Sequence, residues 1–540
     1  MRRFCILSLF LFSLFQIKAQ SINGSVSSAH PLATKAGYDI LKKGGNAFDA
    51  AVAIAAALNV VEPMMSGIGG YGTILIYDAK TKQIRFLNAS GRFPEATNTD
   101  LMRAPTPDYQ KNRIGPKSIS TPGNLNAWAL MHHSYGTTQW ADLFVPAIDY
   151  AERGFIISKN TAGFIQEAYP YFSSYAQQIF GQQSKPLEAG DRLIQKDLAT
   201  TFKRIASEGV DVFYQGSIAK QIDAQMKTAE SFLRFKDLQQ HQAEWWNPLQ
   251  IDYKGYSVYT ASLPANSFAA FVNLGLMREA GSQKLSHNSG EYLHLFAEMT
   301  KLSYKARLAY SFDPDIRQAP LDSILSTQVL RNTLANISKD SASLFKPPFS
   351  VESKNTTHFV VIDQWGNMVS ATQTLGNSFG SRVFIEGTGI CMNNSMAYST
   401  FEPKGNPMDA FPGRHKLSGD CPVIILKDGL PWAALGTPGG HTITQNVPQI
   451  IFNLIDHQMN MQSAIDAPKI AFVEPNFIRV DPDMPEEVLE VLRQKGHQIR
   501  IGSIGNAHGI KILRDVNGKI IGYDIGTDKR GDGKSPVIDR

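Results

Sequence analysis

Cysteine is scarce in this chain of 540 residues, which holds only Cys5, Cys391 and Cys421. Cys5 lies in an N-terminal segment that reads as a removable leader, so one disulfide is possible and a disulfide framework is excluded. The twelve histidines are scattered, and no Cys/His spacing typical of a zinc site occurs. The sequence therefore predicts no metal site, and it leaves open whether Cys391 and Cys421 pair.

A strong excess of charge is also missing. The formal net charge is +5, and it falls to +2 if the leader is removed with its three basic residues, Arg2, Arg3 and Lys18. A balance this small gives no argument for nucleic acid or acidic lipid as a partner. Hydrophobic content of 43% and charged content of 19% are ordinary for a packed globular protein.

Long apolar runs are absent after the first twenty residues. Residues 4–15 are almost wholly apolar, they follow Arg2 and Arg3, and residues 18–20 offer a cleavage region. The run is short for a membrane span. Residues 1–20 are therefore predicted to be the signal peptide of an exported protein, periplasmic or secreted. A retained N-terminal anchor is the alternative.

The rest of the chain predicts mixed helix and strand, without a repeat of 20 to 50 residues. Asn46 is a good N-cap with Asp49 three residues on. Helices are predicted at 31–43, 47–58, 124–133, 140–153, 442–457 and 485–495. Strands are predicted at 73–77, 358–363, 368–374, 388–393, 422–427 and 431–436, with a short pair near 509–524.

The glycine-rich loop at 67–72 satisfies the pattern G-x-G-x-x-G. A dinucleotide site needs that loop after a strand and before a helix, so that the helix N-terminus holds the pyrophosphate. Here the predicted order is helix, loop, strand. The loop is better explained as a tight turn that admits a ligand or a neighbouring backbone.

Thr356 lies where a polar stretch, residues 338–355, meets the apolar strand pattern at 359–362. If the bond after Asn355 is cut, Thr356 carries a hydroxyl nucleophile and a free α-amine. That amine, with an ordinary pKa of about 7.7 to 8, can accept the hydroxyl proton near neutral pH. The alternatives are a plain start of a strand and a glycosylation sequon at 355–357.

Two further features support this hypothesis. A two-residue hairpin loop at Trp365-Gly366 would place Thr374 opposite Thr357, within one position of Thr356. Gly439 and Gly440 follow a predicted strand and leave backbone amides uncovered, as an oxyanion hole requires. Each feature also has an ordinary explanation, as a strand threonine and as a strand-to-helix turn.

With these motifs in view, the chain resembles the γ-glutamyltransferase family of self-cleaving N-terminal-nucleophile hydrolases. The resemblance runs through most of the chain and rests on the order and spacing of six motifs. They are Val60–Gly70, Thr121–Gly123, Pro146–Ile148, Asn355–His358, Gly436–Gly440 and Ala464–Pro468.

The resemblance implies a four-layer αββα sandwich and a precursor that cuts itself between Asn355 and Thr356. The large subunit would be residues 21–355 and the small subunit residues 356–540. Thr356 would be the nucleophile for self-cleavage and for turnover, supported by Thr374. It implies a small-molecule amide as substrate and no cofactor. The Gly439 and Gly440 amides would hold the oxyanion, and Ser418 would line the acyl-donor pocket.

The sequence departs from the family where the α-amino and α-carboxylate groups of a γ-glutamyl donor are held. Losing a carboxylate that pairs with an ammonium removes a bond typically worth about 1.5 to 3 kcal/mol. The segment 398–417 is also short for a lid, which predicts a more open pocket. The departures are Ser90 for an arginine (with Arg92 two places on), Gly376 for an asparagine (with Asn377 next), Ser395 and Tyr398 for a glutamine and an aspartate, and Gly419 for a serine.

Chemistry and substrate are therefore separate expectations. The chemistry is that of a self-cleaving amidohydrolase, with γ-glutamyl amides such as glutathione as the first expected substrates on family grounds. The departures favour an acylase-like branch with a non-glutamyl acyl donor as the alternative. An exported binding protein without turnover and a dehydrogenase are further alternatives from other functional classes.

Overall fold

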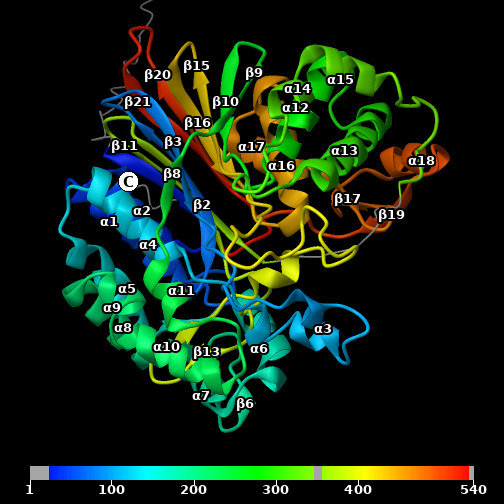
Figure 1. Cartoon of the computed structure of the whole chain (residues 1–540). Coiled ribbons are helices and arrows are strands. Elements are labelled where there is room, and N and C mark those ends of the chain that lie inside the picture. The colour runs from blue at the N-terminus through cyan, green and yellow to red at the C-terminus, as the bar shows by residue number, and fades with distance from the viewer. Residues whose placement is uncertain (1–22, 346–354, 534–540) are drawn as a thin grey trace, which may run out of the picture.

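Two six-stranded sheets lie face to face in the middle of the molecule, and helices cover the outer side of each (Figure 1). This computed structural model describes residues 23–345 and 355–533. The layers run helix, sheet, sheet, helix, which confirms the αββα sandwich predicted from the sequence. The predicted signal peptide at 1–20 lies outside the described residues.

The first sheet combines segments from distant parts of the chain, and all of its neighbouring strands are antiparallel. Two strands that follow Asn355 lie between strands that precede it. The order is β1 (Gly24–Ser28), β11 (Thr357–Asp363), β12 (Met368–Thr374), β2 (Tyr71–Asp78), β3 (Gln83–Ala89) and β8 (Glu244–Trp246).

The second sheet is built in the same way, also with antiparallel neighbours. Four of its strands follow Asn355 and two precede it. The order is β21 (Ile520–Thr527), β20 (His508–Arg514), β16 (Leu430–Gly436), β15 (Val423–Lys427), β10 (Tyr256–Thr260) and β9 (Leu249–Tyr253).

The helices on the first sheet form one continuous core with it. All fifteen residues of the alanine-rich α2 are buried, because small side chains let its backbone lie close to the sheet on one side and to other helices on the rest. The larger helices of this layer are α1 (Pro31–Lys42), α2 (Ala47–Val61), α4 (Asn124–Tyr135), α5 (Val145–Arg153) and α8 (Lys196–Glu208).

A lobe of shorter elements extends from this layer and fills the lower part of Figure 1. Its helices are α3 (Tyr109–Asn112), α6 (Lys159–Ala168), α7 (Ser174–Phe180), α9 (Asp211–Tyr214), α10 (Ser217–Thr228) and α11 (Phe235–Gln240). Its two-stranded ribbons are β4 (Phe155–Ile156) with β7 (Arg192–Leu193), β5 (Gly181–Gln182) with β6 (Lys185–Pro186), and β13 (Phe384–Ile385) with β14 (Ile390–Cys391).

The outer layer of the second sheet has its own core, centred on α12 and α16. A small sheet of β17 (Ile470–Val473), β18 (Phe477–Val480) and β19 (Gln498–Ile501) lies at its edge. The helices are α12 (Phe268–Ala280), α13 (Gly290–Tyr310), α14 (Leu321–Ile324), α15 (Thr327–Leu334), α16 (Ile443–Ile455), α17 (Met461–Asp466) and α18 (Glu486–Gln494).

Short 3₁₀ helices occur in the connections of the described chain. They are Thr99–Met102, Pro116–Ser118, Trp140–Phe144, Tyr169–Tyr171, Ser282–Lys284, Ser395–Tyr398 and Gly440–Thr442.

A third core lies between the two sheets, and its side chains alternate along β11. Phe359 and Val361 belong to the helix-side core, whereas Val360 and Ile362 belong to the core between the sheets. Because side chains on a strand alternate between faces, Thr356 is on the face that meets the second sheet. The site therefore begins where this inner core ends.

Most predicted elements are confirmed, with ends that differ by a few residues. The predicted helix 140–153 starts as a 3₁₀ turn and becomes α5 only at Val145, with Pro146 in its first turn. The predicted strand 388–393 is reduced to the two residues of β14. The glycine loop at 67–72 is the predicted close approach of backbones, since a Cβ on Gly70 would lie 2.4 Å from the Thr374 carbonyl oxygen.

The predicted register of the β11–β12 hairpin is wrong by one position. Ile362 pairs with Met368, so the loop has three residues between Asp363 and Asn367 rather than two. Gly366, with φ +88°, takes the left-handed position that such a loop requires. The Asp363 carboxylate also accepts the Asn367 amide at 2.9 Å and thereby holds the turn.

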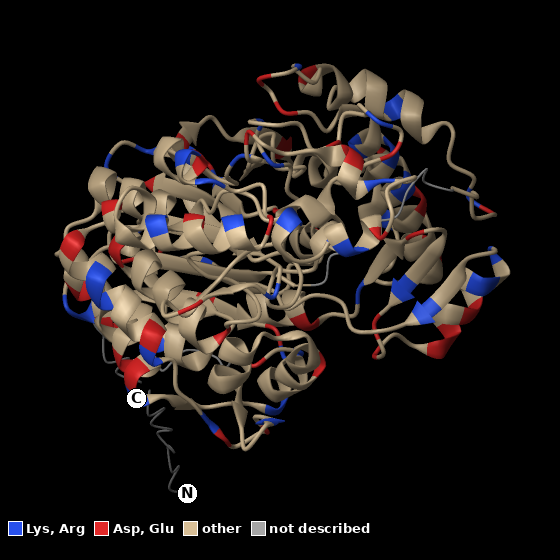
Figure 2. Ribbon diagram, turned by 60° about the horizontal axis from the view of Figure 1, so that its bottom comes forward, with Lys and Arg blue, Asp and Glu red and all other residues tan. Residues whose placement is uncertain are grey.

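Charged side chains of both signs are spread over the outer helices and loops, and few lie on the central strands (Figure 2). This distribution agrees with the small net charge. No helix in the ranges 23–345 and 355–533 is long and apolar enough to cross a membrane. Cys391 and Cys421 are both free and buried, so they do not pair in this structure.

Asp49 is the most heavily hydrogen-bonded carboxylate of the first helical layer, and it is completely buried. It completes the predicted capping box of α2 by accepting the Asn46 amide at 3.1 Å. It also accepts the hydroxyls of Thr137 at 2.7 Å and Thr138 at 3.0 Å, together with both of their amides. One side chain thus joins the start of α2 to the loop that follows α4.

We expect Asp49→Ala to lower the free energy of unfolding by about 3 kcal/mol, because it leaves several buried donors without an acceptor. Urea unfolding monitored by circular dichroism measures this. Asp39→Ala is the matched control, since Asp39 forms only an exposed pair with Lys35 and should cost less than about 1 kcal/mol. Equal effects of the two substitutions would contradict the assignment.

Candidate active site

Thr356 lies immediately before β11 and is 5% exposed. Its hydroxyl donates to the carbonyl oxygen of Asn355 at 2.7 Å. The hydroxyl oxygen therefore lies against the peptide bond at which the sequence predicts cleavage. Asn355 is buried as well, so the sequon at this position offers no accessible glycan acceptor in the folded chain.

Thr357, the first residue of β11, anchors the strand from the opposite face. Its hydroxyl donates to the Glu62 carboxylate at 2.8 Å. Glu62 ends the long α2 and belongs to the motif 60–70; its complete burial raises the pKa of the carboxyl to about 7. Because neighbouring residues of a strand point in opposite directions, this bond fixes the direction in which Thr356 points.

Thr374 ends β12 directly across from Thr356, as the corrected register requires. Its hydroxyl donates to the Asn355 carbonyl oxygen at 2.8 Å and accepts the Gly376 amide at 2.9 Å. The Gly376 amide therefore orients the hydroxyl so that its single proton points at the carbonyl. This oxygen accepts two hydroxyl protons, an arrangement that can stabilise negative charge developing on it.

A row of buried polar side chains continues between the sheets beyond Thr374. Tyr71 on β2 is paired with Thr374. One step further along, His358 Nδ1 lies 2.9 Å from the Thr372 hydroxyl, and its ring packs against Gly436 of β16. Burial lowers the pKa of His358 well below its ordinary value, so the ring is neutral. A Cβ on Gly436 would lie 2.3 Å from this ring, which explains the glycine.

Gly439 and Gly440 form the loop between β16 and α16, with φ values of +133° and +57°. Neither amide donates a hydrogen bond to another residue of the described ranges. The Gly439 carbonyl is held by the amide and the hydroxyl of Thr442, at 3.1 and 2.9 Å. The loop therefore keeps two N–H groups available at the N-terminal end of a helix, where negative charge is favoured.

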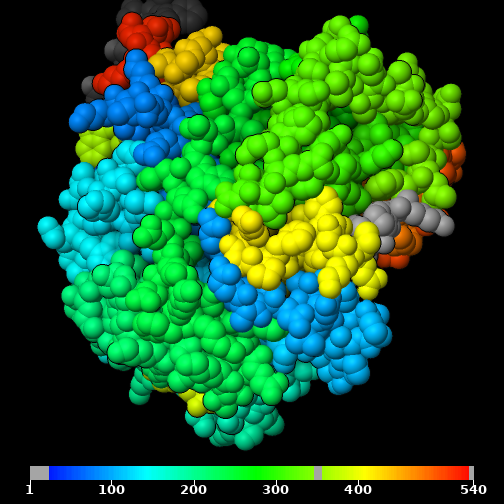
Figure 3. All heavy atoms as spheres, in the orientation of Figure 1, coloured from blue at the N-terminus to red at the C-terminus, as the bar shows by residue number. Residues whose placement is uncertain are grey.

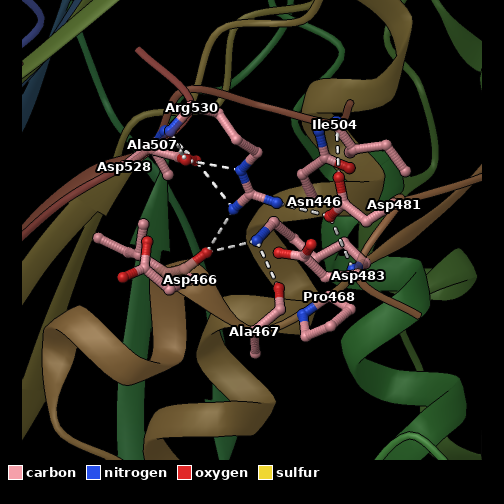
Figure 4. Close-up of polar contacts among 12 residues, drawn as sticks. Asn446, Asp466, Ala467, Pro468, Asp481, Asp483, Ile504, Ala507, Asp528 and Arg530 are labelled. Carbon is pink, nitrogen blue, oxygen red and sulfur yellow. Dashed lines mark hydrogen bonds and ion pairs between the residues drawn. The ribbon is translucent and has the colours of Figure 1, made fainter. Parts of the chain in front are cut away.

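A buried ion-pair network lies beside Asn446 of α16 (Figure 4). Arg530 donates to Asp528 at 2.6 Å and to Asp481 at 2.5 Å. Lys469, which follows the motif 464–468, donates to the Ala467 carbonyl at 2.9 Å. Figure 4 shows Asn446 beside the network, and its side-chain amide donates to the Thr442 hydroxyl at 3.2 Å.

The residues predicted to line the acyl-donor pocket come together in two groups. In the first, the Asn394 side-chain oxygen accepts the Asn377 amide at 2.8 Å and lies so close to Gly376 that a Cβ there would be 2.1 Å away. The Tyr398 ring borders the same glycine, since it would lie 3.3 Å from a Cβ on Gly376, and Ser395 follows Asn394 in the chain. Gly376, Asn377, Ser395 and Tyr398 therefore form one wall.

The second group joins the donor-pocket loop to the glycine loop. Gly419 lies against Gly440, because a Cβ on Gly419 would be 3.1 Å from the Gly440 carbonyl oxygen. Ser418 is fixed through its backbone, which bonds to Pro264 and Asn266. Its buried hydroxyl lies beside the Asp420 carboxylate and helps to lower the pKa of that group against the effect of burial.

Unpaired buried polar atoms gather around this pocket. Native structures leave few such atoms without a partner, because each costs free energy. Several in one place indicate groups that are kept for a ligand. Within residues 23–345 and 355–533 they include the hydroxyls of Ser90, Ser395 and Tyr398.

Arg92 is not directed at the pocket as a substitute for the expected arginine. Its guanidinium pairs with Glu244 at 3.1 Å and with Asp315 at 3.2 Å. Ser90 occupies the arginine position and is completely buried. The structure therefore distinguishes two residues that the sequence could not: Ser90 is buried with a hydroxyl that has no partner among the described residues, whereas Arg92 belongs to a surface ion-pair cluster.

The segment after Tyr398 is short, as predicted, and it is held against the segment near residue 100. Arg103 and Asp409 form a buried ion pair at 3.0 Å, and Lys404 pairs with Asp100 at 2.7 Å. In Figure 3 this segment, coloured yellow, lies against the blue segment near residue 100. The expectation of a more open pocket stays a prediction.

Two clusters have the composition of metal ligands, but their ligand atoms already bind one another or a neighbouring cation. His294 Nδ1 lies 2.8 Å from His497 Nε2, and Lys301 binds Glu298 at 2.7 Å. The other cluster consists of Asp313, Asp315 and His415. There His415 binds Asp313 at 3.0 Å, and the Arg92 guanidinium lies beside it. A neighbouring cation disfavours a metal ion in both clusters.

Comparison with known proteins decides the family. The gamma-glutamyltranspeptidase family model matches residues 33–538. The chain belongs to the γ-glutamyltranspeptidase family. A glutathione hydrolase proenzyme of Bacillus subtilis (strain 168) is 33% identical over 517 residues, covering 91% of this chain and 88% of the relative.

Acylases are similar to this family member to a comparable degree. The acylase ACY 1 proenzyme of Pseudomonas sp. (strain SE83) is 32% identical, covering 89% of this chain and 88% of the relative. The crystal structure of a cephalosporin acylase from Bacillus halodurans superposes with a TM-score of 0.87 at 28% identity, covering 95% of each chain. The protein is thus an amidohydrolase of the γ-glutamyltransferase-like or acylase type.

Sequence reasoning missed four residues of this γ-glutamyltranspeptidase-family site: Tyr71, Asn394, Lys416 and Asp420. Lys416 and Asp420 flank Ser418 and Gly419 directly, so two charged residues in a short stretch before an apolar strand were the available signal. Tyr71 lies in the glycine loop at 67–72. The pattern of that loop indicated a turn, but it gave no sign that the Tyr71 side chain belongs to the site. Nothing in the sequence singles out Asn394 from other asparagines.

Two departures from the family pattern should respond differently to reversal. Gly376 has φ +106° and no room for a Cβ, so Gly376→Asn should sharply reduce the yield of folded protein. Gly419 has ordinary backbone geometry and its Cβ needs only a small shift of Gly440, so Gly419→Ser should fold normally. Soluble yield and thermal midpoint measure both; a well-folded Gly376→Asn protein would contradict the geometry.

Proposed function

We propose that the chain is made as a precursor that cleaves itself between Asn355 and Thr356 and then hydrolyses or transfers acyl groups through Thr356. One observation carries this proposal. The Asn355 carbonyl oxygen is held between the hydroxyls of Thr356 and Thr374, at 2.7 and 2.8 Å. A loop-to-strand junction without chemistry has no need for two hydroxyls on one carbonyl.

The self-cleavage step uses groups that are already in place. The Thr356 hydroxyl oxygen attacks the Asn355 carbonyl carbon, and Thr374 stabilises the oxyanion. The bond from that carbon to the Thr356 nitrogen breaks, and the hydroxyl proton passes to the departing amine. The product is an ester of Asn355 on the Thr356 side chain, which water hydrolyses to release a new N-terminus.

Turnover then repeats the chemistry on an external amide. The freed Thr356 amine accepts the proton of its own hydroxyl, which attacks the substrate carbonyl to form an acyl ester. In this proposal the Gly439 and Gly440 amides hold the oxyanion of this step. Water or an acceptor amine releases the acyl group. No step requires a cofactor.

The subunit division follows from the cleavage position: residues 21–355 and 356–540 after removal of a signal peptide at 1–20. Each central sheet contains strands from both sides of Asn355, which supports a cut chain that stays assembled. We also propose export to the periplasm or beyond, on the basis of the N-terminal sequence alone.

Two candidate substrate classes remain within this chemistry. The relatives named glutathione hydrolase make γ-glutamyl amides the first candidate. The acyl-donor pocket favours the second, an acylase-type donor without an α-amino group. At the positions where the family holds that ammonium, Gly376, Ser395 and Tyr398 offer no carboxylate, and their surroundings are packed by Asn394.

Purified protein is expected to run as two fragments on denaturing electrophoresis, with the smaller one beginning Thr-Thr-His-Phe. Thr356→Ala should give a single intact chain, because the nucleophile is removed. Thr374→Val should slow the appearance of the fragments by about 100-fold, the usual effect of losing one oxyanion donor. Pulse–chase expression with N-terminal sequencing measures these outcomes.

Thr372→Val controls for the loss of a buried threonine hydroxyl on the same strand, since Thr372 contacts His358 rather than the Asn355 carbonyl. It should mature at close to the wild-type rate. Wild-type protein that stays intact and inactive would favour the exported binding protein instead.

Matured enzyme is expected to release more product from a glutaryl anilide than from the γ-glutamyl anilide, because Ser395 and Tyr398, at the positions of the family's glutamine and aspartate, offer no carboxylate to the α-ammonium. Initial rates at matched concentrations of the two anilides measure the difference in kcat/KM. A clear preference for the γ-glutamyl anilide would instead support the first candidate, a glutathione hydrolase.

A further inference from the structure

His358 lies between the strand that starts at the nucleophile and the strand that leads to the glycine loop. It is two residues after Thr356 on the same face of β11, and it is completely buried between the two sheets. Its ring faces Gly436, the last residue of β16, so closely that a Cβ there would lie 2.3 to 2.6 Å from the ring atoms. Gly439 follows Gly436 after only two residues. The ring therefore fills the gap between the two parts of the site.

A second contact between the sheets lies beside the ring. The Ser370 hydroxyl on β12 donates to the Leu435 carbonyl oxygen at 3.2 Å and accepts the Val423 amide at 3.2 Å. Val423 and Leu435 are paired residues of β15 and β16. One hydroxyl of the first sheet thus binds two neighbouring strands of the second. Because hydrogen bonds tolerate only a narrow range of distances, this contact fixes the separation of the sheets just before the glycine loop.

The hydrogen bonds of His358 keep this hydroxyl in place. A hydroxyl has one proton, and that of Ser370 points to Leu435, so His358 Nε2, 3.4 Å away, is the donor to the Ser370 oxygen. Nδ1 then accepts the Thr372 hydroxyl at 2.9 Å. A neutral imidazole has one donor and one acceptor, which agrees with the burial that lowers the pKa of His358 well below its ordinary value.

The two reactions proposed for Thr356 depend differently on this spacing. In self-cleavage the attacked carbonyl is that of Asn355, and its oxygen is already bound by Thr374, which belongs to the same sheet. In turnover the carbonyl belongs to an external amide, and the amides of Gly439 and Gly440 come from a loop that follows a strand of the other sheet. Only turnover therefore requires the two sheets to be correctly spaced.

We propose that His358 is a positioning residue, which fixes the distance between Thr356 and the glycine loop and so supports turnover but not self-cleavage. It acts through Gly436 and Ser370 and touches neither the substrate nor the attacked carbonyl. The inference rests on the proposed function, since it requires Thr356 to carry out both reactions with different oxyanion donors.

The test measures maturation and turnover separately in the same variants. His358→Leu keeps an apolar side chain in the gap but removes both hydrogen bonds. Its kcat should fall by about 10- to 100-fold, as expected when catalytic groups are misplaced by about 1 Å. The KM and the rate at which the two fragments appear should stay within about 3-fold of the wild type. His358→Gln, which keeps a donor and an acceptor, should recover part of the lost kcat.

The substrate is whichever anilide, glutaryl or γ-glutamyl, the wild type cleaves faster, so the outcome does not depend on the choice between the two acyl donors. Fragment appearance is followed by pulse–chase expression and denaturing electrophoresis. A general loss of stability would slow maturation and turnover together, whereas a positioning role lowers kcat alone.

Gly436→Ala tests the same contact from the second sheet. Its added methyl group meets the His358 ring and moves β16, so kcat should fall by about 10-fold or more while maturation continues. Combined with His358→Leu, it should cost less than the product of the two single losses, because both substitutions disturb one contact. Fully multiplicative losses would show that the two residues act independently and would overturn the spacing role.

His287→Gln is the matched control. His287 lies in the outer layer of the second sheet, where its Nε2 is 2.8 Å from the Asn453 side-chain oxygen. The substitution should change neither maturation nor kcat. A His358→Leu enzyme with wild-type kcat, or with maturation and turnover slowed equally, would overturn the inference and leave the proposed function intact. Absence of maturation and turnover in the wild type would overturn the proposed function itself.

If His358→Leu does not fold, Ser370→Ala decides the matter, because it removes only one oxygen atom. The variant loses the bonds to Leu435 and Val423, and its ratio of kcat to maturation rate should fall by at least about 5-fold. An unchanged ratio would overturn the inference.

Discussion

The register between β11 and β12 is the constraint on which the rest of the site depends. Successive side chains on a strand point to opposite faces, so a slip by one residue would turn Thr374 toward the helices and away from the Asn355 carbonyl. The three-residue turn that sets this register is held by Asp363 and by the left-handed Gly366. Two residues far from the chemistry thus align the threonines.

Sequence alone predicted the parts of the site that depend on backbone and residue type. Local patterns predicted a threonine before an apolar strand, a glycine pair after another strand and a capping box at Asn46. The register of the β11–β12 hairpin could not be predicted, because the same residues are compatible with a two-residue and with a three-residue loop. The distinction depends on the side-chain contacts of Asp363, which are visible only in three dimensions.

The burial of Lys416 could not be predicted for a different reason. A lysine in a short polar stretch usually lies in water, and only the packing of Tyr71 and Tyr398 around it removes that option. Similarly, Arg92 seemed a fair replacement for a missing arginine until its contacts with Glu244 and Asp315 were known. In both cases at least one partner, Tyr71 for Lys416 and Glu244 for Arg92, comes from a segment more than a hundred residues away in the chain.

The pocket contrasts with the layers that surround it. Helix and strand bury continuous apolar cores on both outer sides, whereas the space near Thr356 keeps unpaired hydroxyls and charges. Such groups reduce stability where they are. The free energy gained by burying the large apolar cores next to them can offset this loss of stability. The arrangement is therefore consistent with polar groups that serve binding rather than folding.

Because each central sheet combines strands from both sides of Asn355, a cut protein that unfolds would refold poorly. While the chain is continuous, the covalent link at Asn355 keeps β11 near its place between β1 and β2. The effective concentration of β11 there is therefore high. After a cut at Asn355 this link is gone, and two denatured pieces would meet only by diffusion, with exposed strand edges that invite aggregation. The lifetime of the cut protein would then be set by the activation barrier to unfolding, and a molecule that unfolds would not reassemble.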